Sequence, residues 1–170
     1  MPIGVERGRA LRTQAPPYMH GFVRAVVQRV SRAEVRIEQR TIARIGPGLA
    51  VLLGVARGDG EADAAMLADR IVGLRIFADR DGKMNLALGA AGGAMLVVSQ
   101  FTLLADTSHG RRPSFIEAAA PDEARRLYGH FLSLVRAAGV KVEEGEFGAT
   151  MEVELVNHGP VTIILDSRTR

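Results

Sequence analysis

The chain has 170 residues, of which 47% are hydrophobic and 24% charged, and this composition is typical of one ordinary globular domain. It contains no cysteine, which excludes a disulfide scaffold, a thiolate metal site and a cysteine nucleophile. The net charge of +3 comes from the ends of the chain, because five of the 22 basic residues and one of the 19 acidic residues lie in 1–22 and 167–170. The body between them is nearly neutral, so its charge does not by itself indicate a nucleic-acid partner.

The first 22 residues hold Arg, Pro and Gly with little periodicity, and we expect a disordered extension there, with Met19 as a second candidate start. They lack the apolar stretch of a secretory signal, and no segment reaches the ~18 apolar residues that span a membrane. We therefore predict a cytoplasmic protein with no membrane attachment, a domain at 23–166 and a short tail at 167–170.

The body begins with strand patterns and ends with strand patterns. Runs of β-branched and apolar residues predict strands at 23–30, 33–37, 42–45, 49–55, 94–101, 140–142, 151–156 and 161–165. The run at 49–55 is continuously apolar, which is typical of a strand covered on both faces.

Two stretches have the period of a helix. In the first, from 61 to 77, Leu67, Ile71 and Leu74 form one apolar stripe that continues to Ala78. The second begins at Pro121 and is expected to stop at Gly139. A turn at 79–82 lacks the glycine and glutamate offsets of a calcium loop. Together the elements predict a mixed α/β, β-rich single domain with two main helices.

The common catalytic motifs of hydrolases and metalloenzymes are missing from this sequence. His20, His109, His130 and His158 fall in no zinc-binding pattern, and there is no G-x-S-x-G turn. No motif places a Ser/His/Asp triad, although the sequence does not exclude one. We predict neither a metal nor a cofactor.

Two segments carry unusual polar residues. A buried strand ends in Ser99, Gln100 and Thr102 around Phe101, and polar groups in such a place either surface with the strand or face a ligand cleft. The stretch Asn157-His158-Gly159-Pro160-Val161-Thr162 lies between two predicted strands. Its simplest interpretation is a tight turn, and roughly 5–6% of X-Pro bonds in folded proteins are cis.

Taken together, Ser99-Gln-Phe-Thr-Leu103 and Asn157-His-Gly-Pro-Val-Thr162 resemble the two signatures of the D-aminoacyl-tRNA deacylases, also called D-tyrosyl-tRNA deacylases. Four further stretches are similar to that family. They are Arg24–Val30, Gly82–Leu86, Arg112–Phe115 and Phe147–Met151, and the resemblance covers about 23–166.

The resemblance implies an enzyme that hydrolyses D-aminoacyl-tRNA, and glycine mischarged on tRNA, as a homodimer with active sites at the interface. It implies that Ser99, Gln100, Phe101 and Thr102 form the catalytic pocket. Phe147, Met151 and Asn157 would bind substrate, the first two near the terminal adenine. Gly159 and Pro160, joined by a cis bond, would enter the partner subunit's site and exclude L-amino acids by steric contact.

The chemistry implied by the resemblance is consistent with the missing triad. An aminoacyl ester is already activated, so its hydrolysis needs positioning more than a strong nucleophile, and the RNA 2′-hydroxyl is thought to assist. Thr102 without an adjacent base is a poor nucleophile. Two alternatives stay open: a non-catalytic RNA-binding module, and a hydrolase of free D-amino acid esters.

Overall fold

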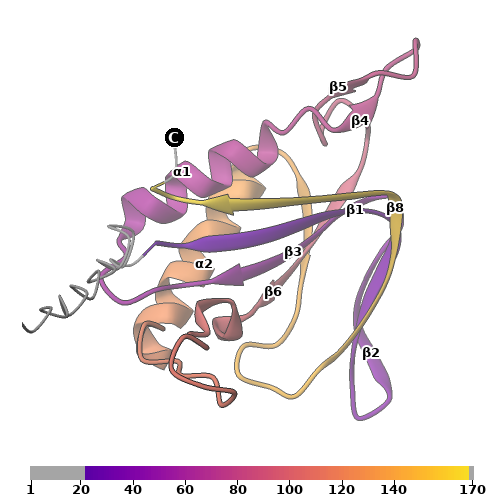
Figure 1. Ribbon diagram of the computed structural model, residues 1–170. Coiled ribbons are helices and arrows are strands. Elements are labelled where there is room, and N and C mark those ends of the chain that lie inside the picture. Colours follow the sequence, from indigo (N-terminus) through magenta and orange to yellow (C-terminus); the bar gives the residue numbers. More distant parts are fainter. Residues whose placement is uncertain (1–21, 169–170) are drawn as a thin grey trace, which may run out of the picture.

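The computed structural model describes residues 22–168, and a curved sheet with two helices on one face makes up most of them (Figure 1). Strand β1 (Arg24–Ile37) is central. Its first half lies between β3 (Gly48–Gly54) and β8 (Glu152–Asp166), and its second half lies between β2 (Arg40–Ile45) and β8, all antiparallel. The mixed α/β domain with two helices is therefore confirmed.

Three parallel strands continue the sheet on the other side of β1. Strand β3 pairs with β6 (Ala94–Ser99), which pairs with β7 (Lys141–Glu144). Strand β2 curls back into contact with β6 and β7, so the sheet is nearly closed. As predicted, β3 is covered on both faces, and six of its seven residues are buried.

Two pairs of predicted strands are single strands in the structure. The segments 23–30 and 33–37 form one β1, and 151–156 and 161–165 form one β8. The predicted turn between the latter two is wrong, because Asn157–Pro160 lies inside β8 as a bulge. There the pairing jumps from Gln28↔Thr162 to Val30↔Asn157. Local composition marked the interruption, but the long partner strand keeps both halves in one ladder.

The first helix is shorter than its apolar period predicts. Helix α1 (Glu61–Val72) stops before Gly73, Leu74 is only half-buried, and Phe77–Ala78 forms β4, paired with β5 (Met84–Leu86). The predicted turn at 79–82 is confirmed as the hairpin tip, where the Gly82 N–H donates to the Asp79 carbonyl at 3.0 Å. Helix α2 (Pro121–Ala137) begins as predicted, and Gly139 follows it with φ +83°.

Two apolar clusters hold the layers together. One lies between the helices and the sheet and includes Leu67, Ile71 and Phe131. The other lies inside the curl of the sheet and includes Val35, Ile45, Ala50, Leu96 and Val98. Because β3 and β6 contribute to both clusters, their positions are fixed from both faces, and so are the segments that follow their carboxyl ends.

At the two chain ends, the structure describes residues from Phe22 to Arg168. Apart from Phe22, the predicted disordered extension falls outside the described residues, and the domain bounds at 23–166 stay predictions. Ser167 is buried and its N–H donates to the Val23 carbonyl at 3.0 Å. Within residues 22–168, no helix has the length and apolarity needed to cross a membrane.

Candidate active site

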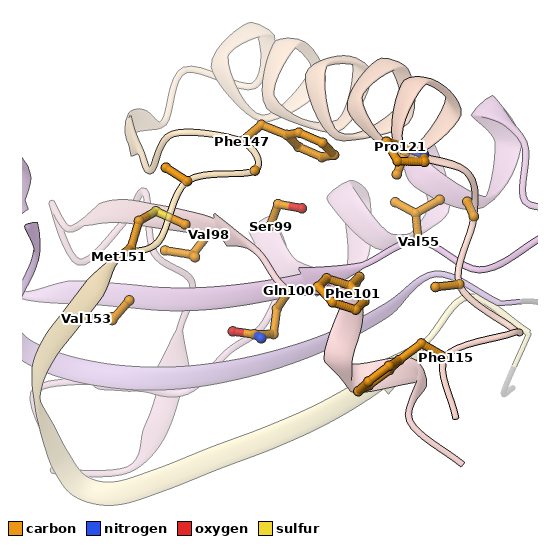
Figure 2. Close-up of a pocket in the computed structure, with 15 residues that line it drawn as sticks. Val55, Val98, Ser99, Gln100, Phe101, Phe115, Pro121, Phe147, Met151 and Val153 are labelled. Atoms are coloured by element: carbon orange, nitrogen blue, oxygen red, sulfur yellow. The ribbon is translucent and has the colours of Figure 1, made fainter. Parts of the chain in front are cut away.

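A cavity of about 540 Å³ opens beyond the carboxyl ends of the parallel strands β3, β6 and β7 (Figure 2). Four chain segments converge on it: one follows β3, one follows β6, one leads into α2, and one joins β7 to β8. The lining residues are Val55, Val98, Ser99, Gln100, Phe101, Phe115, Ala118, Ala119, Pro121, Ala124, Phe147, Gly148, Ala149, Met151 and Val153. The ends of parallel strands are a common place for ligands.

The pocket is apolar, with few polar side chains. Ser99 and Gln100 are the polar side chains among its lining residues in the part of the chain that the structure describes, and no titratable side chain lines it. Such a surface can hold and orient a ligand, but it offers no general acid or base of its own.

The predicted strand at 94–101 ends earlier, at Ser99, and a short 3-10 helix, η1 (Phe101–Leu104), follows it. The change of direction is fixed by the Gln100 N–H, which donates to the Leu53 carbonyl at 2.8 Å. The first N–H groups of a helix have no intrahelical acceptor, so those of Phe101 and Thr102 are available at this turn. The Gln100 side-chain amide donates to the Thr102 hydroxyl.

Phe101 lies at the mouth of the pocket with 54% of its surface exposed. The Phe115 ring packs against it edge to face, with centroids 5.1 Å apart and planes at 70°. Figure 2 shows the two rings side by side at one end of the pocket. Phe115 had no predicted role, although its stretch Arg112–Phe115 is one of those similar to the family.

Phe147 and Met151 come from the segment after β7 and line the pocket with Ser99 and Gln100. The Phe147 ring packs on buried Tyr128 with centroids 5.9 Å apart, and the Arg125 guanidinium lies 4.6 Å from its centroid. In Figure 2 the ring points from its loop toward the start of α2. A ring held on its neighbours in this way is suited to contact a nucleic-acid base.

The bulge in β8 has a defined shape. The Gly159–Pro160 bond is cis, and Gly159 has φ +127°, a conformation that L side chains rarely adopt. The side chain of Asn157 makes both contacts: its Oδ1 accepts from the Val161 N–H at 3.1 Å, and its Nδ2 donates to the Thr162 hydroxyl at 3.0 Å. Arg29 Nε, from β1, donates to the backbone carbonyl of His158 within the bulge at 3.1 Å.

Of the nine predicted site residues, five line the pocket. They are Ser99, Gln100, Phe101, Phe147 and Met151. Thr102 is tied to them through Gln100. Asn157, Gly159 and Pro160 are not among the lining residues within 22–168, so one copy of the described chain does not bring the bulge to its own pocket.

The structure does contain a Ser, a His and an Asp in contact, in the loop before Phe115. Ser108 Oγ lies 2.9 Å from His109 Nδ1, and Asp106 Oδ2 lies 3.6 Å from the same nitrogen. In a catalytic triad the hydroxyl and the carboxylate meet different ring nitrogens, so this arrangement is not one. Hydrogen bonds from Ser108, side chain first, hold the pKa of Asp106 below its usual range. No group of three or more potential His, Cys, Asp or Glu metal ligands occurs among residues 22–168.

Comparison with known proteins gives a consistent result. The family model described as D-Tyr-tRNA(Tyr) deacylase matches residues 26–166. The D-aminoacyl-tRNA deacylase of Dehalococcoides mccartyi is 62% identical over 148 residues, which is 87% of this chain and 97% of that protein. The protein of the same name from Anaeromyxobacter dehalogenans is 59% identical over 146 residues, covering 86% and 98%.

Solved structures agree with the fold. One titled "c-Myc DNA Unwinding Element Binding Protein" is 37% identical with a TM-score of 0.79, covering 84% of this chain and 97% of that one. One titled as a probable eukaryotic D-amino acid tRNA deacylase has a TM-score of 0.74 at 19% identity, covering 85% and 99%, and supports the fold alone. Since the family model and close relatives span nearly the whole described body, the chain belongs to the D-Tyr-tRNA(Tyr) deacylase family.

Proposed function

We propose that this protein hydrolyses the ester bond between a D-amino acid, or mischarged glycine, and the 3′ ribose of tRNA, releasing the free amino acid and tRNA. One observation carries the proposal: Ser99–Phe101 from the end of β6 and Phe147 and Met151 from the segment after β7 meet in one apolar pocket. The curated relatives that cover almost the whole body are named for the same activity.

Each part of the pocket has a proposed task. Phe147 and Met151 contact the terminal adenine, whose flat face suits an aromatic ring and a thioether. The side chains of Gln100 and Thr102, which are hydrogen-bonded to each other, orient the aminoacyl group. The free N–H groups of Phe101 and Thr102 stabilise the negative oxygen that forms when water attacks the ester carbon.

The reaction requires no strong nucleophile in this proposal. Water adds to the ester carbon, the bond to the ribose oxygen breaks, and that oxygen takes up a proton. Because none of the residues between 22 and 168 that line the pocket is titratable, we assign assistance of the proton transfer to the neighbouring 2′-hydroxyl of the RNA. The protein contributes position and oxyanion stabilisation.

Rejection of L-amino acids is assigned to the bulge in β8 of a second subunit. A homodimer would bring the Gly159 and Pro160 carbonyls of one copy into the pocket of the other, against the Cβ of an L-amino acid. The hydrogen bonds of Asn157 and Arg29 keep that bulge in shape. A thousandfold preference requires about 4 kcal/mol, which a rigid backbone contact can supply.

The test compares D-Tyr-tRNA with L-Tyr-tRNA, using the wild type and a Gly159→Ala, Pro160→Ala double variant. A Cβ at Gly159 would lie 2.8 Å from Val161 Cγ2, so the bulge must change shape in the variant. We expect rapid loss of the D ester alone with the wild type, and loss of activity or of selectivity with the variant. Sedimentation of the wild type should give the mass of a dimer.

Two results would decide against the proposal in different ways. A folded wild type that binds tRNA in a salt-dependent manner but does not turn over the D ester would be a binding module. Equal turnover of free D-amino acid esters and D-Tyr-tRNA would indicate a general esterase.

A further inference from the structure

Asp59 is a buried carboxylate in the loop between β3 and α1, and the proposed mechanism does not use it. Only 6% of its surface is exposed. Its Oδ2 accepts a short hydrogen bond from the Ala56 N–H at 2.6 Å. Its Oδ1 is buried and has no hydrogen-bond partner among residues 22–168. A buried carboxylate with one unpartnered oxygen is costly to keep ionised.

The charged groups around Asp59 come from α1 and from the residues that follow β8. Burial raises its pKa to about 6, the Ala56 N–H opposes that shift, Asp63 adds to it, and Arg168 opposes it. Asp63 Oδ2 accepts from the Gly60 N–H at 3.0 Å, and its Oδ1 accepts from the Ser167 hydroxyl at 3.0 Å. The start of α1 is thus served by Asp63, and Asp59 is not needed as its cap.

Glu61, at the start of α1, is directed to the other helix, where it pairs with Arg126 of α2 at 2.6 Å. The contact between Arg57 and Glu117 is made by their backbones, with the Arg57 N–H donating to the Glu117 carbonyl at 2.8 Å.

The loop that Asp59 fastens is joined directly to the wall of the pocket. Ala56 forms a β-bridge with Ala118, and the Ala119 N–H donates to the Val55 carbonyl at 3.0 Å. Val55, Ala118 and Ala119 all line the pocket. The Ala56 residue that bridges to Ala118 is also the one whose N–H is held by Asp59.

We propose that Asp59 is a positioning residue for the reaction: through the Ala56 N–H it holds the Val55–Arg57 loop against residues 117–119 and so fixes one wall of the substrate pocket. This inference rests on the proposed function. A hydrogen bond to an ionised carboxylate in a buried place is roughly twice as strong as one to a neutral acceptor. Ionisation therefore strengthens the local hydrogen bond that holds the wall, although burial of the charged carboxylate lowers the stability of the chain as a whole. Protonation weakens that local bond, and the wall loosens.

The test uses Asp59→Asn, which keeps a side-chain oxygen but carries no charge at any pH. Asp69→Asn, which changes an exposed carboxylate on the neighbouring helix α1, is the matched control. Values of kcat and KM for D-Tyr-tRNA are measured between about pH 5 and pH 8. For the wild type we expect KM to rise by about tenfold as the pH falls through the titration of Asp59, with a smaller change in kcat.

For Asp59→Asn we expect a KM at neutral pH equal to that of the wild type at low pH, with no inflection. Asp69→Asn should follow the wild type. Hydrogen exchange provides a second readout that does not depend on catalysis: the amides of Arg57 and Ala119 should exchange faster in Asp59→Asn than in either of the other two proteins.

Several results would overturn the inference. An unchanged KM profile and unchanged exchange in Asp59→Asn would overturn it whatever the melting temperature, because Asp59 would then affect stability alone. An inflection that persists in Asp59→Asn would belong to another group and would overturn the inference. If the wild type does not hydrolyse D-Tyr-tRNA, the proposed function fails, and the exchange of Arg57 and Ala119 still decides whether Asp59 holds this wall.

Discussion

Gly54, the last residue of β3, has no room for a side chain. Replacing it tests whether activity depends on the position of the turn that follows β6. A Cβ at this position would lie 2.6 Å from Leu104 Cδ2 and 2.8 Å from the Gln100 carbonyl oxygen. The leucine methyl can rotate away. The Gln100 carbonyl is backbone, and its N–H is already fixed by the Leu53 carbonyl at 2.8 Å.

The size of the effect of Gly54→Ala follows from these contacts. Restoring an ordinary contact of about 3.4 Å moves the Gln100 carbonyl by about 0.6 Å, and the start of η1 moves with it. Overpacking of this kind costs about 1–3 kcal/mol of stability. Since a shift of about 1 Å can cost a hundredfold in rate, we expect kcat/KM for D-Tyr-tRNA to fall by about tenfold or more.

The assay pairs urea denaturation with the rate of D-Tyr-tRNA hydrolysis. Gly129→Ala, within α2, is the control, because a Cβ there meets nothing within 4 Å. That variant should be as active as the wild type and up to about 1 kcal/mol more stable. Full activity and full stability of Gly54→Ala would contradict this prediction, since the contacts at Gln100 would then be relieved without moving the turn.

Three further changes test the packing and the charges. Tyr128→Phe removes the hydrogen bond of 2.9 Å that the Tyr128 hydroxyl donates to the Val97 carbonyl. Because that carbonyl still accepts from the Gly145 N–H, urea denaturation should show a free energy of unfolding lower by about 1 kcal/mol and not by about 3 kcal/mol. Gly48→Ala places a Cβ 1.8 Å from the Ala94 carbonyl oxygen, so the pairing of β3 with β6 must be disrupted there. The free energy of unfolding should fall by at least about 3 kcal/mol, and an unchanged melting temperature would contradict this. The pKa of Asp59 is about 6 in the folded chain, against an ordinary value of 3.8. The folded chain therefore favours the protonated carboxyl, which contributes its full stabilisation below about pH 4 and loses it as the pH rises through 6. Asp59→Asn should therefore gain up to about 3 kcal/mol on the wild type between about pH 4 and 8, and parallel pH curves for the two proteins would disprove it.

The sequence alone determined the elements whose pattern depends on local contacts. The continuous apolar run of β3 predicted a strand covered on both faces, and Pro121 with the following period predicted α2, because these signals act within a few residues. The two family signatures and the similar stretch Phe147–Met151 also predicted nine site residues, and five of the nine lie in one pocket.

Contacts between distant segments set where two predicted strands join into one and which segments line the pocket together. The bulge at Asn157–Pro160 has the composition of a turn, but β1 pairs with β8 on both sides of it and keeps one continuous ladder. Helix α1 ends at Val72 although the apolar period continues, because the following residues pair as β4 with β5.

The roles of Phe115 and Asp59 likewise depend on the segments that surround them. The edge-to-face contact of Phe115 with Phe101 and the bridge from Ala56 to Ala118 join residues with no local relation in the chain. Hydrophobic periodicity and turn composition report which face of an element is buried. The partner that covers that face is set by packing between elements far apart in sequence, and the pocket is formed by such packing.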